Sequence, residues 1–467
     1  MPGPDSPAAD SAARTPPEPD FSFNIGDAED SLEHMRALLA RFGDIYRVYS
    51  PGRRRYAYVI NHPDDVRRVL VINHGNYIKG FGLDRVKVLT GNGLVTSEGD
   101  FWRSQRAMMQ PMFQRKHLTR FAGFVAAAND RLLLRWERQA GSKAPSGAAP
   151  SGAPSGEPTG EPTGPPVGGP INVTDDLSAL TLEIILRAIF GEDFDRMSDG
   201  SGNHPFQFVA SDPTRDLGFA YRFRQLRTLV AELAARRRHE SVAEPEDFLG
   251  MLVAARARGT GASMGERELI DEVMTLIIAG HETAASTLNS AWYLLTQHPE
   301  IEARLHAEVD AAAEPAILDL AATENLRYTR AVLVETLRLY PPVWLISRRT
   351  LAPDVLAGYE IPAGVDVLLS PYFVQRHPQF WSEPEKFWPE RPEAAQEARR
   401  ARCAYIPFSA GPRHCIGESM GMFEMCVHLF KVARRLRLRY PPGTPMELDA
   451  QINLRSRAPL MMHVERR

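Results

Sequence analysis

Apolar residues recur at spacings of three and four along most of the chain, which predicts a mainly helical protein. The longest such run extends from about Glu266 to Gln297 and ends at His298 and Pro299, because proline cannot continue a helix. A helix longer than about 25 residues has to cross the whole core. Strand-like runs are short and occur at 56–60 and 365–369. We therefore expect a mainly helical body with a small strand-rich lobe.

Two stretches lack this periodicity. Residues 1–22 are rich in Pro, Ala and Asp, and they predict a disordered tail. Residues 141–170 carry Pro-Ser-Gly and Glu-Pro-Thr-Gly repeats, which predict a flexible insertion between two helices. We expect Thr174 or Asp175 to cap the second of these helices. The rest of 23–467 is expected to form a single domain.

Composition narrows the class of protein. The 467 residues are 43% hydrophobic and 24% charged, which is typical of a globular enzyme. The net charge of −3 gives no bulk attraction to nucleic acid or to an anionic membrane. Three cysteines cannot build a disulfide framework, and neither a signal peptide nor an apolar run long enough to span a bilayer is visible. We expect a soluble, cytoplasmic protein without a membrane anchor.

One cysteine lies in an unusual setting. Residues 408–417 read FSAGPRHCIG and precede a helical run, so Cys415 is predicted at a helix N-terminus. Free N–H groups and the helix dipole stabilise a thiolate there, lower its pKa and make it a competent metal ligand. Gly411 and Gly417 suit a tight bend or a close approach to a flat cofactor. The alternative for a lone cysteine is a buried inert thiol, and we keep that interpretation for Cys403 and Cys426.

This loop resembles the haem-binding loop of the cytochrome P450 family. The matching positions are Phe408, Gly411, Arg413, Cys415 and Gly417. The resemblance runs from about residue 30 to the C-terminus and is to the soluble, bacterial-type members. It implies the cytochrome P450 fold, with haem b (iron protoporphyrin IX) between the long central helix and the Cys-bearing helix. Cys415 would be the iron ligand, and a thiolate ligand favours O–O cleavage.

Two further helices carry residues that fit this resemblance. Glu335 and Arg338 are three apart on one helical face, and with Arg391 they look like the family's Glu-Arg-Arg structural triad. We assign these three to fold integrity rather than to chemistry. The residues that resemble the family's haem-propionate partners are Trp102, Arg106, Arg413 and Arg349, with Arg348 as the alternative register to Arg349. Each of these arginines could instead be an ordinary surface cation.

The long helix contains the sequence AGHET among apolar residues. A carboxylate is costly there unless it has a partner or a task, so Glu282 is notable. Gly280 weakens the helix and Thr283 can bond back to a carbonyl, which favours a local distortion. The stretch resembles the family's acid–alcohol pair. That likeness implies that Thr283 donates a hydrogen bond to oxygen bound at the iron while Glu282 relays protons. The alternative is a helix-bending threonine beside a surface glutamate.

Electrons are expected to come from another protein, because no GxGxxG loop for a flavin or nicotinamide is present. The resemblance implies a separate ferredoxin and an NAD(P)H-dependent reductase. An acidic ferredoxin could dock on a basic face, and the candidate cations are Arg115, Lys116, Arg120, Arg434, Arg435, Arg437 and Arg439. Each could equally belong to a solvated surface. We expect a monomer.

The substrate is less well defined by the sequence. By family likeness the pocket residues above the haem are Ile278, Ala279, Val343, Trp344 and Leu345. They are apolar, so we expect hydroxylation or epoxidation of an apolar molecule such as a fatty acid, terpenoid or other secondary metabolite. The 191–220 region is short and polar compared with the family, which leaves the substrate class open. The alternatives are a peroxygenase or other haem-thiolate enzyme, and a non-catalytic haem carrier or sensor.

Overall fold

The computed structural model describes most of the chain. The described residues are 14–26, 30–140, 168–199, 203–211, 217–240, 245–257, 259–313, 318–391 and 403–467. The insertion predicted at 141–170 lies outside these residues except for 168–170, and so does the tail before residue 14.

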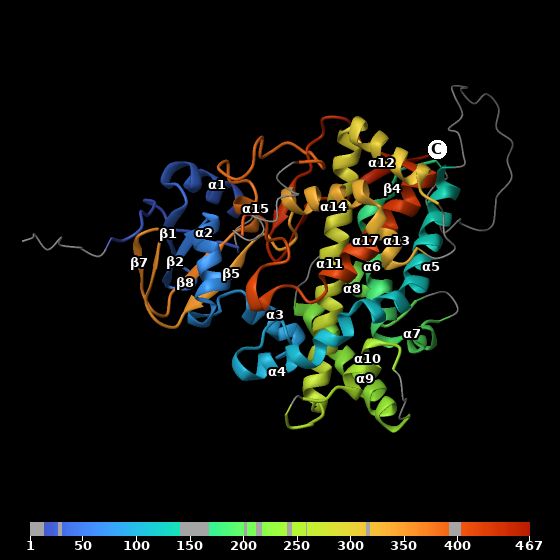
Figure 1. Ribbon diagram of the computed structural model, residues 1–467, viewed down its shortest axis with the longest axis horizontal. Coiled ribbons are helices and arrows are strands. Elements are labelled where there is room, and N and C mark those ends of the chain that lie inside the picture. Colours follow the sequence, from blue (N-terminus) through green and yellow to red (C-terminus); the bar gives the residue numbers. More distant parts are fainter. Residues whose placement is uncertain are drawn as a thin grey trace, which may run out of the picture.

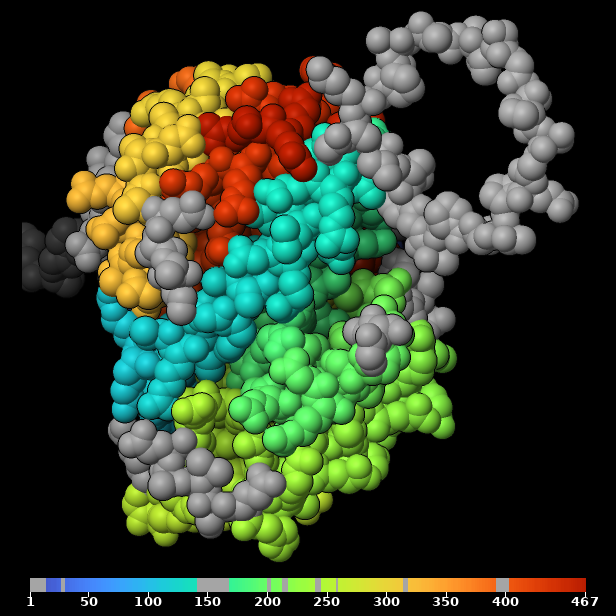
Figure 2. All heavy atoms as spheres, turned by 90° about the vertical axis from the view of Figure 1, so that its right-hand side faces the viewer, coloured from blue at the N-terminus to red at the C-terminus, as the bar shows by residue number. Residues whose placement is uncertain are grey.

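A helical body forms the larger part of the described chain (Figure 1). Its longer helices are α4 (Gly99–Met109), α5 (Arg115–Ala140), α6 (Val173–Phe190), α9 (Leu217–Glu240), α11 (Glu266–Gln297), α12 (Pro299–Ala311), α14 (Arg327–Leu339) and α17 (Glu418–Arg435). The shorter ones are α3 (Leu83–Thr90), α7 (Glu192–Met197), α8 (Phe208–Ser211), α10 (Phe248–Ala254) and α13 (Leu320–Asn325). Three further helices lie beside the strands instead: α1 (Ser31–Phe42), α2 (Pro63–Arg67) and α15 (Pro371–Val374). Viewed from the side, α5 crosses one face of the molecule as a continuous band (Figure 2).

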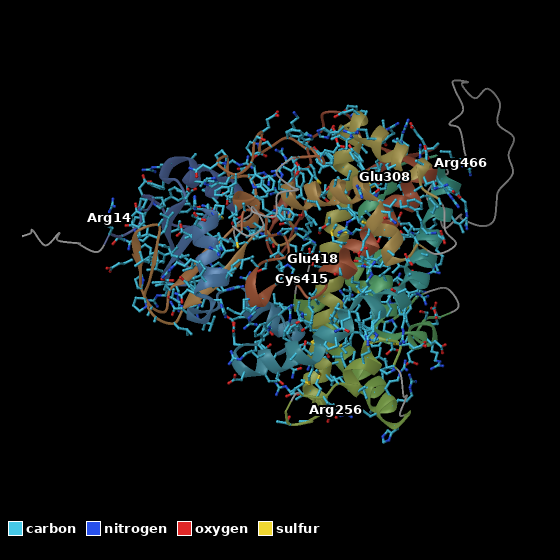
Figure 3. All side chains as sticks on the ribbon, in the orientation of Figure 1. Arg14, Arg256, Glu308, Cys415, Glu418 and Arg466 are labelled. Carbon is cyan, nitrogen blue, oxygen red and sulfur yellow. The ribbon has the colours of Figure 1, made fainter. Side chains whose placement is uncertain are left out.

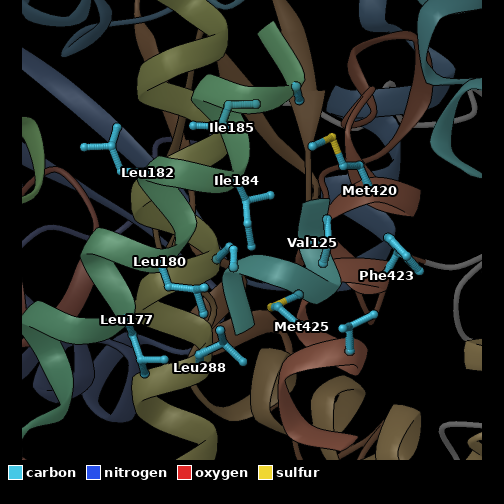
Figure 4. Close-up of a cluster of buried hydrophobic side chains, with 14 of the residues drawn as sticks. Val125, Leu177, Leu180, Leu182, Ile184, Ile185, Leu288, Met420, Phe423 and Met425 are labelled. Carbon is cyan, nitrogen blue, oxygen red and sulfur yellow. The ribbon is translucent and has the colours of Figure 1, made fainter. Parts of the chain in front are cut away.

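The long helix α11 has the predicted bounds, and its centre packs along α6. A side chain at Gly280 would not fit between them, since a Cβ there would lie 2.7 Å from Cδ1 of Ile185. The glycine therefore allows close packing of the two helices. Figure 4 shows where α5, α6, α11 and α17 meet, with Val125, Ile184, Leu288 and Met425 contributing to one buried cluster.

A strand-rich lobe lies beside the body, on the left of Figure 1. Its five-stranded sheet has the order β1-β2-β8-β5-β3, in which only β2 and β8 of the neighbouring pairs are parallel. These strands are β1 (Ile45–Ser50), β2 (Arg55–Ile60), β3 (Tyr77–Lys79), β5 (Ile346–Thr350) and β8 (Asp366–Leu369). The remaining described strands form three small sheets. One contains β4 (Ile171–Asn172), β9 (Leu436–Arg439) and β12 (Met461–Arg466). The other two are the pairs β6 (Asp354–Leu356) with β7 (Tyr359–Ile361) and β10 (Leu448–Ala450) with β11 (Leu454–Ser456). The predicted helical body with a small strand-rich lobe is confirmed.

Two local predictions are wrong. The end of the expected tail is ordered, because the carbonyl of Pro17 accepts a hydrogen bond from the N–H of Arg47 at 2.9 Å and Glu18 pairs with the same arginine. The cap of α6 is Asn172, whose side-chain oxygen accepts from the N–H of Asp175 at 3.1 Å, and not Thr174 or Asp175. Asparagine is among the preferred N-cap residues.

Candidate active site

Cys415 lies in the turn that leads into α17, near the middle of the molecule (Figure 3). Its N–H donates to the carbonyl of Phe408 at 2.9 Å, which closes the turn. Gly411 has a φ of 68°, and a Cβ there would lie 2.1 Å from the carbonyl oxygen of Leu70. The glycine is therefore required by a backbone contact within the protein. Gly417 is adjacent to the sulfur, since a Cβ there would lie 3.9 Å from Sγ.

The thiol of Cys415 is accessible although protein surrounds it on nearly all sides. Burial raises its pKa, and the amides of Gly417 and Glu418 with the guanidinium of Arg106 lower it by less. The expected low pKa is therefore wrong for the free thiol, because the cost of burying a charge exceeds the helix N-terminal effect. A thiol bound to a metal ion is deprotonated by the charge of the metal itself.

The middle of α11 carries small and hydroxyl side chains. Ala279 is exposed although Leu276 and Ile277 just before it are buried, so the helix is accessible at this point. The hydroxyl of Thr283 donates to the carbonyl of Ala279 at 2.9 Å, as predicted. The expected local distortion does not interrupt the helix, because α11 is a continuous α-helix through residues 266–297.

Glu282 has a cationic neighbour that sequence reasoning missed. Nη1 of Arg455, on β11, lies 3.7 Å from the Glu282 carboxylate, and the same guanidinium donates to Asp449 at 3.1 Å. The Glu282 side chain is about one-fifth exposed (19%). It therefore lies between the buried part of α11 and the charged hairpin formed by β10 and β11.

Several cations surround a single carboxylate next to the Cys loop. Arg413 forms an ion pair with Glu98, and Lys79 donates through its backbone N–H to the same carboxylate at 2.6 Å. Arg348 is buried beside them. Burial and the neighbouring guanidinium groups of Arg348 and Arg413 lower the pKa of Lys79 to about 7, and burial and Arg413 lower that of Arg348 to about 10.

This arrangement is unfavourable for the protein alone, because buried like charges repel each other. It suits a ligand that brings two carboxylates, as haem does with its propionates. The accessible thiol and this cationic group together fit a haem.

Arg106 and Trp102 on α4 support the same region. Nη1 of Arg106 donates to the carbonyl of His414 at 2.7 Å, so this arginine fixes the residue before Cys415. The guanidinium of Arg413 lies 3.7 Å from the centre of the Trp102 ring, a cation–π contact that positions it.

Arg349 has a carboxylate partner of its own. It forms a two-point ion pair with Asp366 on the neighbouring strand, at 2.9 and 3.2 Å. Successive side chains of a strand point to opposite faces, so Arg348 joins the cationic group where Arg349 was expected.

The structural triad has the predicted contacts. Nε and Nη2 of Arg338 donate to the two oxygens of Glu335 at 2.8 Å each, and Nε of Arg391 donates to Oε1 at 2.8 Å. All three side chains are buried. Arg338 also donates to the carbonyl oxygens of Gln375, Pro384 and Lys386, so the triad ties the end of α14 to the segment before the Cys loop.

The cationic group opens into a cavity of about 940 Å³. Val343 and Leu345 line it. Trp344 does not, since it is buried in the strand-rich lobe, where its carbonyl accepts from Ser370. Ile278 is partly buried against the helical core.

The predicted basic face is largely neutralised. Arg115 forms a two-point pair with Glu324 at 2.8 Å, and Arg437 and Arg439 share Glu302. Arg434 donates to backbone carbonyls of α12 and the residue after it, and Arg435 lies 3.7 Å from Glu137. Lys116 and Arg120 are exposed.

An accessible cysteine just before a helix, a cationic group for carboxylates and a long helix with an acid–alcohol pair are the features of a haem-thiolate type of site. The sequence model of the cytochrome P450 family matches residues 21–457. Cyclooctat-9-en-7-ol 5-monooxygenase of Streptomyces melanosporofaciens is 33% identical over 95% of both chains. The chain therefore belongs to the cytochrome P450 family, and it is a haem b-dependent monooxygenase.

Other relatives agree with this assignment. Cyclooctatin synthase of the same organism is 33% identical over 94% of this chain and 92% of its own. Pentalenene oxygenase of Streptomyces avermitilis is 29% identical over 88% of this chain and 87% of its own. The crystal structure of a cytochrome P450DA heme domain has the same fold, with a TM-score of 0.80 at 22% identity over 97% of this chain and 98% of the other. Within the described residues, no helix combines the length and the apolar character that a bilayer-crossing segment needs.

Proposed function

We propose that this monooxygenase oxidises a terpenoid-like carbon skeleton, using two electrons from a separate ferredoxin. The observation that carries the proposal is the accessible Cys415 thiol, whose loop contributes Ser409 and Arg413 to a cavity that the apolar residues Val343 and Leu345 also line. The 33% identity to two enzymes of cyclooctatin formation supports the terpenoid class.

The residues that would hold the haem follow from their contacts. Cys415 would bind the iron, and Arg106, Arg413, Arg348 and Lys79 would bind the propionates in place of the predicted Arg349. When bound, the haem activates dioxygen with two electrons and inserts one oxygen atom into the substrate. Trp102 positions Arg413 by its ring contact, and Arg106 holds the Cys loop through the His414 carbonyl.

Thr283 and Glu282 would supply protons. The Thr283 hydroxyl points at its own helix carbonyl, and rotation about χ1 would let it donate into the site instead. Glu282 is reached from solvent beside Arg455, so it can exchange a proton with water and pass it inward.

The test is ferredoxin-driven turnover of Thr283→Ala compared with Thr287→Ala. Thr287 lies one turn further along α11 and donates to the Thr283 carbonyl at 2.9 Å, so its loss removes a similar bond away from the site. Thr283→Ala should lower the fraction of electrons recovered as product, and Thr287→Ala should retain it. Equal coupling in both variants would refute the proton-delivery role.

The substrate class is tested by a screen for spin-state changes in the Soret band. Cyclic terpene hydrocarbons and alcohols should displace iron-bound water and shift the spin state. If only linear fatty acids do so, the terpenoid proposal is wrong.

Ferredoxin docking is expected near Lys116 and Arg120, which are exposed at the start of α5 together with the Glu324-paired Arg115. Lys116→Glu should slow reduction by an acidic ferredoxin at low salt and leave reduction by dithionite unchanged. Full turnover with hydrogen peroxide and no ferredoxin would instead favour a peroxygenase.

A further inference from the structure

Two histidines and an aspartate from distant parts of the chain meet beside the five-stranded sheet. Asp44 directly precedes β1, His62 lies between β2 and α2, and His377 follows α15. One ring nitrogen of each histidine and one carboxylate oxygen of Asp44 lie within 4.8 Å of one another. Among the described residues, no other three His, Cys, Asp or Glu side chains bring potential ligand atoms this close together. Two imidazoles and a carboxylate are a ligand set that Zn²⁺ prefers.

The backbone orients both rings. Nδ1 of His62 accepts from the N–H of Asp64 at 3.2 Å and so caps α2, and Nδ1 of His377 accepts from the N–H of Gln379 at 3.2 Å. Nε2 of His377 therefore carries the ring proton and lies 3.2 and 3.3 Å from the two oxygens of Asp44. This hydrogen bond lowers the pKa of the Asp44 carboxyl group, so the carboxylate is charged at neutral pH.

The separation of these atoms suits a tetrahedral ion. Bonds of about 2.0–2.2 Å place neighbouring ligands of a zinc ion about 3.3 Å apart. The 3.2 Å between Nε2 of His377 and Oδ1 of Asp44 already has this length. The ligand nitrogen of His62 is within 4.8 Å of both, and rotation of that ring closes the remaining distance.

The surroundings shield the site on one side and leave it open on the other. The rings of His62 and His377 meet edge to face at 5.3 Å, and Phe380 contacts them at 5.5 and 5.3 Å. The side chain of His377 is 8% exposed, whereas those of His62 and Asp44 are 24% and 33% exposed. An ion can therefore enter from solvent and keep a water molecule as its fourth ligand.

Binding an ion has a cost at the two rings. An imidazole that binds a metal through Nε2 carries its proton on Nδ1, so the bonds from the N–H groups of Asp64 and Gln379 are given up. Both bonds are at the long end of the usual range, and three ligand bonds replace them. We therefore expect a reversible site that a strong chelator empties.

We propose that Asp44, His62 and His377 bind a Zn²⁺ ion that ties β1 and β2 to the segment after α15. This segment is also held by the structural triad, because the carbonyl of Gln375 accepts from Arg338 at 3.0 Å. The ion therefore stabilises the attachment of the sheet to that segment. The proposal is independent of the proposed function, because none of the three ligands belongs to the haem site.

The test is equilibrium dialysis of the EDTA-treated, EDTA-freed holoprotein against buffered Zn²⁺, with zinc and haem iron counted in the same sample. The wild type should bind one zinc per iron. Asp44→Asn keeps the shape of the side chain, and His62→Asn keeps an acceptor that can cap α2. Each should bind zinc at least about tenfold more weakly, because even the loss of an outer partner of a metal ligand costs about 10–100-fold in affinity. Zinc should raise the melting temperature of the wild type more than that of either variant.

His74→Asn is the matched control, because His74 is an exposed histidine between α2 and β3 that does not belong to the cluster. It should bind zinc as the wild type does. X-ray absorption at the zinc edge, which is separate from that of iron, should show nitrogen and oxygen ligands with imidazole among them. Asp44→Asn decides the question if His62→Asn does not fold. A wild type without bound zinc, an Asp44→Asn variant of unchanged affinity, or sulfur among the zinc ligands would overturn the proposal.

Discussion

Replacing Glu335 by glutamine should remove a large fraction of the stability of the holoprotein. The Glu335 carboxylate accepts from Nε and Nη2 of Arg338 and from Nε of Arg391 at 2.8 Å each, and from the N–H of Trp388 at 3.1 Å. Glutamine has nearly the same shape but no charge, so two buried guanidinium groups would lose their only shared counter-charge within the triad. Breaking a buried ion pair by removing one partner costs about 3–5 kcal/mol. A domain is typically stable by about 5–15 kcal/mol, so the loss is a large fraction.

The assay is urea unfolding of the holoprotein followed by the Soret band, with Glu324→Gln as the control. Glu324 also makes a two-point pair with an arginine, Arg115, but both side chains are about half exposed. Solvent and salt screen an exposed pair, so the control should change stability little. If Glu335→Gln and Glu324→Gln lower the free energy of unfolding equally, burial does not strengthen the triad's contribution to stability, and the reasoning is refuted.

Three further outcomes are expected. Arg348→Gln should weaken haem retention, measured as transfer to apomyoglobin, by more than Arg349→Gln does. The reverse order would show that Arg349 is the propionate partner, as the sequence predicted. Gly411→Ala should destabilise the Cys loop and yield little haem-loaded protein, because a Cβ would lie 2.1 Å from the Leu70 carbonyl at a φ of 68°; a fully loaded variant of unchanged melting temperature would contradict this. Burial raises the pKa of Glu272 to about 8, with a smaller contribution from Asp271, so folding takes up a proton and stability should fall as pH rises from about 4.5 to about 8. Glu272→Gln keeps an acceptor for the Leu94 N–H and should flatten that profile; an unchanged slope would refute it.

Periodicity in the sequence was enough to locate the elements that carry the site. The bounds of α11 followed from its apolar run and from Pro299, and Glu335 and Arg338 followed from helical spacing. These are local properties of the chain. The contact of Arg391 with Glu335 followed only from the family resemblance, because it joins residues 56 apart.

The remaining residues could not be found locally. A shift of one residue in a strand moves a side chain to the other face, which is why Arg348 and Arg349 were ambiguous. Glu98, Lys79 and Arg455 acquire their roles only through contacts with distant elements. The pKa of Cys415 depends on burial by the whole fold, which the helix N-terminus alone did not reveal.

The central claim is that Cys415 is the iron ligand, and the ferrous carbon monoxide spectrum tests it most directly. The wild type and Cys426→Ala, which alters a buried cysteine of α17, should both give the strongly red-shifted Soret band of thiolate ligation. Cys415→His should bind haem and give the less shifted band of imidazole ligation. A wild type without the red-shifted band, or a Cys415→His variant that retains it, would contradict the account.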